Sequence, residues 1–208
     1  MKRIADSTVR RLSLYLRFLE ETAQRGVTTT SSDDLARRGG TTSAQVRKDL
    51  SFFGSFGKRG LGYSVPELSA SLREILGLGR RWRVIIVGAG KIGTALAQYH
   101  GFAQRGFHVV AVYDRDPRKI GSLRGSLVVR DASELETDLR ETPADIAVVA
   151  TPAEGAQAVV DRLARAGMKA VLNFAPTQLT VPSDVTLRHV NMAMELEALS
   201  FALSSKAR

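Results

Sequence analysis

A short apolar strand that runs directly into a glycine-rich turn constrains this chain more than any other feature. Residues 84–87 read Val-Ile-Ile-Val and lead into Gly-Ala-Gly-Lys-Ile-Gly at 88–93. In a Gly-x-Gly-x-x-Gly motif the first glycine permits a tight turn, the second lets backbone approach a pyrophosphate, and the third lets the next helix pack on the strand. The motif predicts a dinucleotide site whose phosphates lie at a helix N-terminus. The alternative is a turn of the same shape without a ligand.

The pattern after this motif predicts a parallel sheet. Helical segments separate most of a series of apolar runs, which lie at 84–87, 109–112, 127–129, 146–150 and 170–172. Strand–helix alternation with continuously apolar strands is typical of a sheet covered by helices on both faces. We therefore expect an α/β fold with a Rossmann-like, doubly wound parallel sheet in the C-terminal part.

A carboxylate stands where a nucleotide ribose would need one. Asp114 ends the second expected strand, 21 positions after Gly93, and can accept the adenosine ribose 2′-hydroxyl. This favours NAD(H) over NADP(H), although Arg115 could accept a 2′-phosphate. Residues 151–152 and 173–176 follow later strands at the carboxyl edge, where open parallel sheets bind ligands. Both could also be ordinary turns.

The N-terminal part predicts a helix-turn-helix. Residues 8–25 have helical periodicity, and the face expected to be buried comprises Val9, Leu12, Leu16, Leu19 and Ala23, with Tyr15 beside it. Ser31 or Ser32 is expected to cap a short second helix. Thr42 and Gln45 read as a capping box that opens a third helix at about 43–53. Two short helices joined by a tight turn form the DNA-binding motif.

The third helix and the turn after it carry a basic surface. Val46, Leu50 and Phe53 are expected to be buried, which leaves Arg47 and its neighbours exposed as a recognition face. Four glycines and two cations at 54–63 predict a hairpin wing that reaches phosphates or the minor groove. The candidate DNA contacts are Ser31, Ser32, Gln45, Arg47, Lys48, Ser51, Lys58, Arg59 and Gly60.

Charge supports this division of the chain. The formal net charge is +9, and residues 1–82 hold 15 Lys or Arg against 8 Asp or Glu, whereas residues 83–208 hold 15 against 13. A basic N-terminal part fits nucleic acid, although solvated charge on a generally basic protein is the alternative. The hinge-like stretch at 77–81 predicts a winged-helix domain at 1–79 and a nucleotide-binding and dimerisation domain at 80–208.

Several classes of protein are disfavoured. The 208 residues include no cysteine, which excludes disulfides and thiolate metal sites. No signal peptide and no apolar run of membrane-spanning length are evident, so we expect a cytoplasmic protein with no metal and no membrane partner. His100, His108 and His189 fall in no acid–base constellation, so the nucleotide is interpreted as a signal and the protein as no enzyme.

Taken in order, these motifs resemble the Rex family of redox-sensing transcriptional repressors. The resemblance covers nearly the whole chain and is carried by residues 30–32, 45–51, 57–63, 88–93, 99–102, 114–117 and 173–176. It implies a homodimer that binds a palindromic operator in double-stranded DNA and represses respiratory or fermentative genes. It also implies that NADH releases the DNA, that NAD+ competes for the same site, and that the C-terminal helix is exchanged between subunits.

The C-terminal segment supports the last of these implications. The expected helix at about 192–204 has two apolar sides, formed by Leu196, Leu199 and Leu203 and by Met194, Ala198, Phe201 and Ala202. Such a helix needs burial, either against a partner or on its own domain. The Rex family often carries aspartate and phenylalanine where this chain has Asn191 and Met192. Asn191 could still bond Tyr99, but it offers no charge to an arginine such as Arg17.

These considerations define one main prediction and two alternatives. The protein is expected to be a repressor that senses the NADH/NAD+ ratio. The alternatives are a small NAD-dependent dehydrogenase and a CoA- or nucleotide-binding module whose N-terminal domain contacts protein. The candidate cofactor residues are Gly88, Ala89, Gly90, Lys91, Ile92, Gly93, Tyr99, Asp114, Arg115, Thr151, Pro152, Asn173, Phe174, Ala175 and Pro176, and the candidate switch residues are Arg17, Asn191 and Met192.

Overall fold

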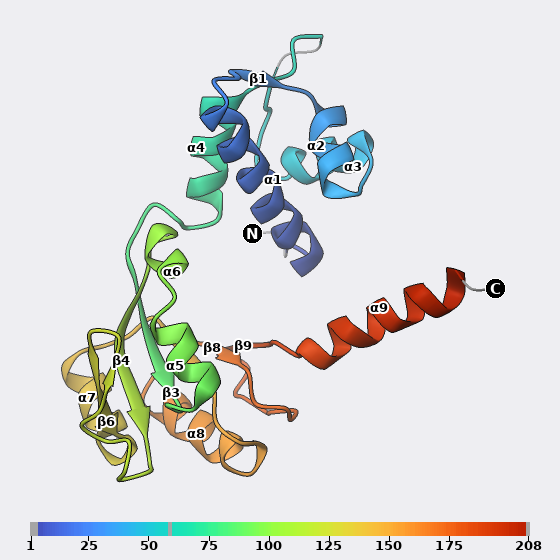
Figure 1. Cartoon of the computed structure of the whole chain (residues 1–208). Helices are drawn as coiled ribbons and strands as arrows, with labels where there is room; N and C mark the ends of the chain where they lie inside the picture. Colours follow the sequence, from blue (N-terminus) through green and yellow to red (C-terminus); the bar gives the residue numbers. More distant parts are fainter. Residues whose placement is uncertain (1–3, 58–59, 207–208) are drawn as a thin grey trace. The chain divides into compact units, whose positions relative to one another are not determined.

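The protein folds as two compact units that meet at residues 80 and 81 (Figure 1). A computed structural model describes residues 4–57 and 60–206. Each unit has a hydrophobic core of its own. The N-terminal unit is mainly helical, and the C-terminal unit is built on a parallel sheet.

Helices dominate the N-terminal unit. Its elements are α1 (Asp6–Gln24), β1 (Thr29–Thr30), α2 (Ser32–Gly39), α3 (Ser43–Ser51), β2 (Tyr63–Ser64) and α4 (Val65–Ile75). The core includes the expected leucines of α1, and Tyr15 is fully buried among them. The prediction of Val9 and Ala23 as core residues is wrong, because both are exposed at the ends of the buried stripe. Thr8 is buried instead.

Side-chain caps begin the two short helices. Ser31 accepts a hydrogen bond from the Asp34 backbone N–H at 3.1 Å, and the Asp34 carboxylate accepts one from the Ser31 backbone N–H at 3.3 Å. Thr42 accepts a hydrogen bond from the Gln45 backbone N–H at 3.1 Å. The Gln45 side chain, however, donates to Asp49. The expected Thr42–Gln45 capping box is therefore only half formed, and the reciprocal box lies at Ser31.

The glycine-rich turn returns on itself near its ends. Gly57 and Gly62 have φ values of +73° and +78°, and a Cβ on Gly57 would overlap the Gly62 carbonyl oxygen. The strand β2 that follows pairs antiparallel with β1. The strand that follows the turn therefore pairs with β1, the strand before α2. The described part of the turn does not form a two-stranded hairpin of its own. Lys58 and Arg59, the predicted wing cations, lie outside the described residues.

The C-terminal unit has the element order expected for a doubly wound sheet. It comprises β3 (Trp82–Val87), α5 (Lys91–Ala97), α6 (Gly101–Gln104), β4 (Phe107–Asp114), β5 (Leu123–Arg124), β6 (Leu127–Asp131), the 3₁₀ turn η1 (Ala132–Glu134), α7 (Leu135–Glu141), β7 (Ile146–Val149), α8 (Ala153–Arg165), β8 (Ala170–Asn173), β9 (Thr186–His189) and α9 (Met192–Lys206).

Strand order places a crevice at the centre of the sheet. The described strands run in the order β5-β6-β4-β3-β7-β8-β9, and only the β5–β6 pair is antiparallel. From β3 the chain first builds outward through β4 and β6, then crosses back to β7, β8 and β9. Open α/β sheets bind ligands where the strand order reverses in this way, beyond the carboxyl ends of the strands. The ends of β3, β4 and β7 therefore mark the expected site.

Both faces of the sheet are covered. Along β3, Ile85 and Val87 pack in a cluster with Leu135 and Leu163 of the helices α7 and α8. Ile86 faces the opposite cluster, to which Leu96 of α5 contributes. Successive side chains of a strand point to opposite faces, so a strand buried on both sides is continuously apolar.

The last helix differs from the others in its burial. Every side chain from 192 to 205 is exposed within the described chain, including the large apolar side chains of Leu199 and Phe201. In Figure 1 α9 extends away from the sheet of its own unit. Among the described residues no helix is long and apolar enough to cross a membrane.

Candidate nucleotide pocket and nucleic-acid interface

A cavity of about 490 Å³ lies at the carboxyl edge of the sheet, over the glycine turn. Its walls come from the segments that follow β3, β4 and β7 and from the start of α8. Eight residues predicted from the sequence line it: Gly88, Gly90, Lys91, Ile92, Asp114, Arg115, Thr151 and Pro152. The sheet therefore brings segments far apart in the sequence together at the crevice.

A side chain would be unfavourable at each glycine of the turn, for a different reason at each position. Gly88 has a φ of +108°, and a Cβ there would stand 2.5 Å from the Ala150 carbonyl oxygen. A Cβ on Gly93 would overlap the Gly88 carbonyl oxygen, so α5 could not pack this closely. A Cβ on Gly90 would meet no atom within 4 Å and would stand in open space beside the cavity. No atom of this chain occupies the space beside Gly90 within 4 Å of that position, and this space fits a bound pyrophosphate.

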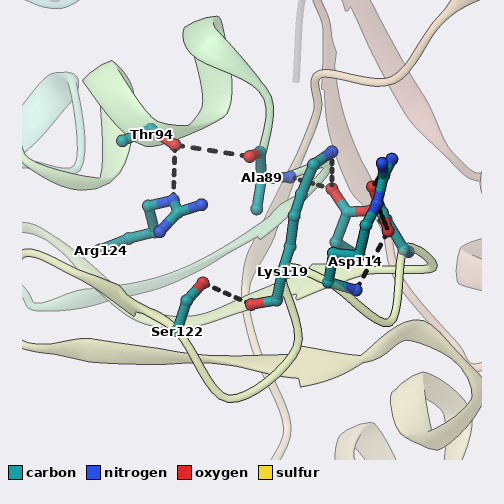
Figure 2. Close-up of polar contacts among 8 residues, drawn as sticks. Ala89, Thr94, Asp114, Lys119, Ser122 and Arg124 are labelled. Carbon is teal, nitrogen blue, oxygen red and sulfur yellow. Dashed lines mark hydrogen bonds and ion pairs between the residues drawn. The ribbon is translucent and has the colours of Figure 1, made fainter.

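Asp114 (Figure 2) is one of two carboxylates that line the pocket, the other being Asp116. Its Oδ2 accepts hydrogen bonds from the Ala89 backbone N–H at 2.7 Å and from Lys119 Nζ at 3.0 Å. Its Oδ1 accepts one from the Asp116 backbone N–H at 2.9 Å. Burial by itself raises the pKa of Asp114, but these hydrogen bonds outweigh it and hold the pKa below its ordinary value. Asp114 is therefore a fixed carboxylate that keeps acceptor capacity for a ribose hydroxyl.

A buried hydroxyl in the same cavity has no partner. The Oγ1 atom of Thr151 is buried and makes no hydrogen bond to the described residues. Burying a hydroxyl without a hydrogen bond costs about 1–3 kcal/mol, so such an atom in a cavity wall points to a ligand. Arg115 also lines the cavity and extends toward α8, with Nη1 3.9 Å from where a Cβ of Gly155 would be. Polar and cationic residues thus line one open cavity.

Two cationic residues near the pocket did not stand out in the sequence. Lys119 lines both the cavity and an adjacent groove of about 680 Å³, and Arg124 lines that groove. Arg124 Nε donates a hydrogen bond to Thr94 Oγ1 at 2.9 Å, as Figure 2 shows. In the sequence, Lys119 is marked only by its position in the loop after β4, five residues beyond Asp114.

Other predicted cofactor residues lie outside the cavity wall. Ala89 lines the adjacent groove, and Gly93 is buried in α5. Tyr99 is 60% exposed and packs edge-on against Phe102 with ring centroids 5.0 Å apart. The turn at 173–176 does not line the cavity. Asn173 is fully buried and bonds within its own turn.

The N-terminal unit gathers the predicted DNA contacts on one surface. A hollow of about 620 Å³ is lined by Ser31, Ser32, Arg47 and Gly60, together with Gly57. Arg47 is exposed, and its Nη1 donates a hydrogen bond to Ser32 Oγ at 2.9 Å. This bond links α3 to the start of α2. Lys48 and Ser51 are exposed on the same helix.

A buried carboxylate beneath this surface was not predicted. Asp49 of α3 is 0% exposed and accepts hydrogen bonds from Arg11 Nε at 2.6 Å, Gln45 Nε2 at 2.8 Å and Tyr15 Oη at 3.1 Å. Burial by itself raises the pKa of Asp49, but these hydrogen bonds, led by that from Arg11, hold the pKa below its ordinary value. Burial, and secondly the negative charge of Asp49, raise the pKa of Tyr15 to about 12. Gln45 is thus engaged inside the unit.

Comparison with known proteins fits this arrangement. The family described as "Putative DNA-binding protein N-terminus" matches residues 3–51, and the family "CoA binding domain" matches residues 80–177. The redox-sensing transcriptional repressor Rex of Carboxydothermus hydrogenoformans is 48% identical over 199 residues, which cover 96% of each chain. This chain belongs to the Rex family of redox-sensing transcriptional repressors. The Rex protein of Streptomyces coelicolor is 47% identical over 98% of this chain and 79% of its own length.

Solved Rex structures share the fold over the whole chain. RSP in complex with β-NAD+ and operator DNA is 38% identical, with a TM-score of 0.94 over 100% of this chain and 95% of RSP. RSP in complex with β-NADH is 36% identical, with a TM-score of 0.92 over 100% of this chain and 97% of RSP. The resemblance to the Rex family and the prediction of a repressor rather than an enzyme are therefore confirmed.

Proposed function

We propose that this protein is an NADH-responsive repressor that binds operator DNA when NADH is low and releases it when NADH binds. The observation that carries the proposal is the pocket at Gly90, Asp114 and Thr151 on a chain that aligns end to end with Rex repressors. Open space beside Gly90, a fixed carboxylate and an unpartnered hydroxyl are what a dinucleotide requires of this fold.

The residues of the pocket fit NAD(H) group by group. The glycine turn leaves room for the pyrophosphate, and Lys91 lines the same cavity with its positive charge. Asp114 accepts the hydroxyls of the adenosine ribose and disfavours a 2′-phosphate by charge repulsion. Arg115 offers a planar cation at the adenosine side. Thr151 supplies a hydrogen bond toward the other half of the dinucleotide.

The nicotinamide half extends from β3 toward the ends of β7 and β8. Asp114 fixes the adenosine half on the β4 side of the glycine turn, so the other half must lie across the crevice. The turn at 173–176 follows β8 on that side. NADH and NAD+ differ only at the nicotinamide ring, so the residues that distinguish them belong near this turn.

The N-terminal unit is the DNA reader. Arg47 and Lys48 lie on the exposed face of α3 and are suited to base edges in the major groove. Ser31, Ser32 and Gly60 border the same hollow and are suited to phosphates. Gln45 is assigned to holding Asp49 rather than to DNA, because its amide is already bonded inside the unit.

Two copies of the chain act together. A palindromic operator requires a two-fold dimer with its recognition helices about 34–36 Å apart. The exposed apolar helix α9 is suited to burial against a partner subunit, which supports the exchange of this helix. Asn191 Oδ1 accepts a hydrogen bond from the Ala193 backbone N–H at 3.0 Å, so it caps α9 within its own chain. A DNA-binding repressor of this kind acts in the cytoplasm.

NADH can shift the dimer only by preferring one of its states. Moving an equilibrium from 1:99 to 99:1 requires about a 10⁴-fold preference, near 5.5 kcal/mol. Tyr99, which is 60% exposed, is suited to contact the partner's exchanged helix, and Arg17 and Met192 are further candidates for the switch.

Operator binding titrated with NADH and with NAD+ at fixed salt tests the proposal. NADH should release the DNA at concentrations where NAD+ does not, and excess NAD+ should oppose the release. Fluorescence anisotropy of a labelled operator measures both effects. Operator binding that ignores NADH would refute the sensor. Release by CoA alone would favour a CoA-binding module, and turnover of NADH with a carbonyl substrate would favour a dehydrogenase.

A further inference from the structure

The strands β8 and β9 end side by side, and the segments that follow them have different roles. Asn173 and His189 are register partners at the last position of each parallel strand. Asn173 begins the turn at 173–176, and the Phe174 backbone N–H of this turn donates a hydrogen bond at 2.8 Å to the carbonyl oxygen of Val149, two residues before Thr151 of the cavity lining. His189 is followed by only two residues before α9 begins. One pair of residues therefore joins the nucleotide side of the sheet to the base of the exposed helix.

The Asn173 side chain forms its hydrogen bonds inside the protein. Its Oδ1 accepts a hydrogen bond from the Ala175 backbone N–H at 2.8 Å. Its Nδ2 lies 3.0 Å from the Ala175 carbonyl oxygen, 3.2 Å from the Thr177 carbonyl oxygen and 3.1 Å from His189 Nδ1. Because Oδ1 accepts from an N–H, the amide orientation is fixed and Nδ2 is the donor. Asn173 therefore holds the turn and reaches the ring of His189.

The same amide faces the ring of His189. Nδ2 of Asn173 shares its two N–H groups among three neighbours, and a hydrogen bond to the ring requires Nδ1 as the acceptor, with the ring proton on Nε2. The Asn173 carbonyl oxygen also accepts a hydrogen bond from the Val190 backbone N–H at 2.8 Å. The start of the turn and the end of β9 are thus joined by one main-chain and one side-chain bond.

The helix has no other anchor on its own unit. The side chains from 192 to 205 are all exposed in the described chain, so packing on its own unit does not fix the direction of α9. Its direction is set by the segment 189–191, which the pair with Asn173 holds. A shift of the turn at 173–176 would therefore be passed to α9 through these two bonds.

We propose that His189 is a positioning residue that couples the turn beside the nucleotide pocket to the base of α9. This inference rests on the proposed function, because it names the contact by which the nucleotide site changes the dimer. His189 lines neither the nucleotide cavity nor the hollow of the N-terminal unit. Its Nδ1 acceptor keeps the end of β9 in register with the turn, so that both segments move together.

Three variants separate coupling from binding. His189→Phe keeps a ring but removes the acceptor, His189→Asn places an amide oxygen near the position of Nδ1, and Thr186→Val alters an exposed side chain on the same strand as a control. For each variant we would measure the affinity for NADH without DNA, the affinity for operator without NADH, and the NADH concentration that releases half of the operator.

His189→Phe should leave both separate affinities within about twofold and raise the half-release concentration of NADH by about tenfold, a typical size for coupling between sites. His189→Asn should recover most of the response, and Thr186→Val should respond as the unmodified protein does. Unchanged release in His189→Phe would overturn the proposal. So would a loss of NADH affinity equal to the change in release, because His189 would then act in binding. Failure of His189→Asn to restore release would also overturn the proposal, because an acceptor at this position would then not be what joins the two segments.

A spectroscopic readout avoids dependence on any variant. In protein labelled with ¹⁵N-histidine, the Nδ1 signal of His189 should be that of an unprotonated acceptor and should move when NADH binds. A proton on Nδ1, or a signal indifferent to NADH, would contradict the proposal. Unmodified protein that binds NADH yet never releases operator would instead refute the proposed function, and this is decided before any variant is made.

Discussion

Asp49 in the N-terminal unit and Asp114 in the C-terminal unit are both buried carboxylates with lowered pKa values, but their surroundings differ. Asp49 is fully enclosed and bonded by the side chains of α1 and of its own helix. Asp114 lines a cavity, its side chain is 9% exposed, and two of its three hydrogen bonds come from backbone N–H groups. The first carboxylate is closed to any ligand, and the second is open to one.

The difference separates two uses of buried charge. A buried ion pair adds little stability over an apolar core, because desolvation offsets the attraction, but breaking it is costly. The Arg11–Asp49 pair therefore serves to fix α3 against α1, so that Arg47 and Lys48 face outward. Asp114 instead keeps a lone pair at the cavity, where a ribose hydroxyl can use it. Asp49 fixes a helix whose exposed face carries Arg47 and Lys48, whereas Asp114 itself lines the cavity.

The largest expected effect distinguishes these two carboxylates by stability. Asp49→Asn should lower the free energy of unfolding of the N-terminal unit by about 3 kcal/mol, because the buried acceptor of the hydrogen bonds from Arg11 and Tyr15 loses its charge. Asp114→Asn should cost less than about 1 kcal/mol, because water can enter the cavity. Amide hydrogen exchange in α3 and in β4, followed in denaturant, measures each unit separately. Equal losses in the two variants would break the comparison.

The pH dependence of stability should also reflect the burial of Asp49. The folded pKa of Asp49 lies below its unfolded value, so its contribution to stability is present above about pH 3.9 and is lost as the pH falls through the folded pKa. The N-terminal unit should therefore unfold in acid more steeply in the unmodified protein than in Asp49→Asn. Parallel acid transitions in the two proteins would remove Asp49 from this role.

The next prediction concerns the cavity that Asp114 lines. Gly90→Val should weaken NADH binding by at least about 100-fold, near 2.7 kcal/mol, because its side chain would stand where the phosphates approach. Operator affinity without NADH should be unchanged, since α3 lies in the other unit. Gly79→Val is the matched control, because a Cβ there also meets open space but lies outside the cavity. Calorimetry measures the nucleotide, and retained NADH affinity would show that Gly90 does not face it.

The elements that could be predicted are those whose pattern is repetitive. The five apolar runs became β3, β4, β6, β7 and β8, because a strand buried on both faces must be apolar throughout. The strand β9 was missed, because it lies at the sheet edge and its residues, Thr-Leu-Arg-His, are mostly polar.

Within the sites, the residues that close contacts over long sequence separations could not be predicted. Asp49 lies next to Leu50 on the buried stripe of α3, but an aspartate in a helix reads as a solvent-facing residue until Arg11 and Tyr15 are known to reach it. Lys119 was missed for a similar reason, since its pairing with Asp114 depends on how the loop after β4 folds back. The glycine motif was predicted because its chemistry is local.

The third prediction concerns the surface that Asp49 holds in place. Arg47→Ala should cost about 1–3 kcal/mol on the operator and much less on unrelated DNA, because a base contact is lost. Lys58→Ala should weaken all sequences alike and reduce the salt slope by about 1, because a phosphate contact is lost. Operator and random DNA, each titrated over a range of salt, separate the two effects. An equal loss on both DNAs for Arg47→Ala would assign Arg47 to the phosphates.

The smallest expected effect concerns the selectivity of the open carboxylate. Asp114→Ala should weaken NADH and strengthen NADPH, so that their affinity ratio changes by about tenfold, near 1.4 kcal/mol. Removing Asp114 leaves Lys119 without its ion-pair partner and Arg115 in the same lining, so a 2′-phosphate would meet two cations. The remaining carboxylate of the lining, Asp116, is paired with Arg118 at 2.9 Å. Lys119→Ala is the opposing variant: it leaves the charge of Asp114 uncompensated and should raise the preference for NADH. Calorimetry with both nucleotides measures the ratio. Equal affinity for NADH and NADPH in the unmodified protein would show that Asp114 does not read the ribose, and its backbone bonds to Ala89 and Asp116 would then make it a structural carboxylate like Asp49.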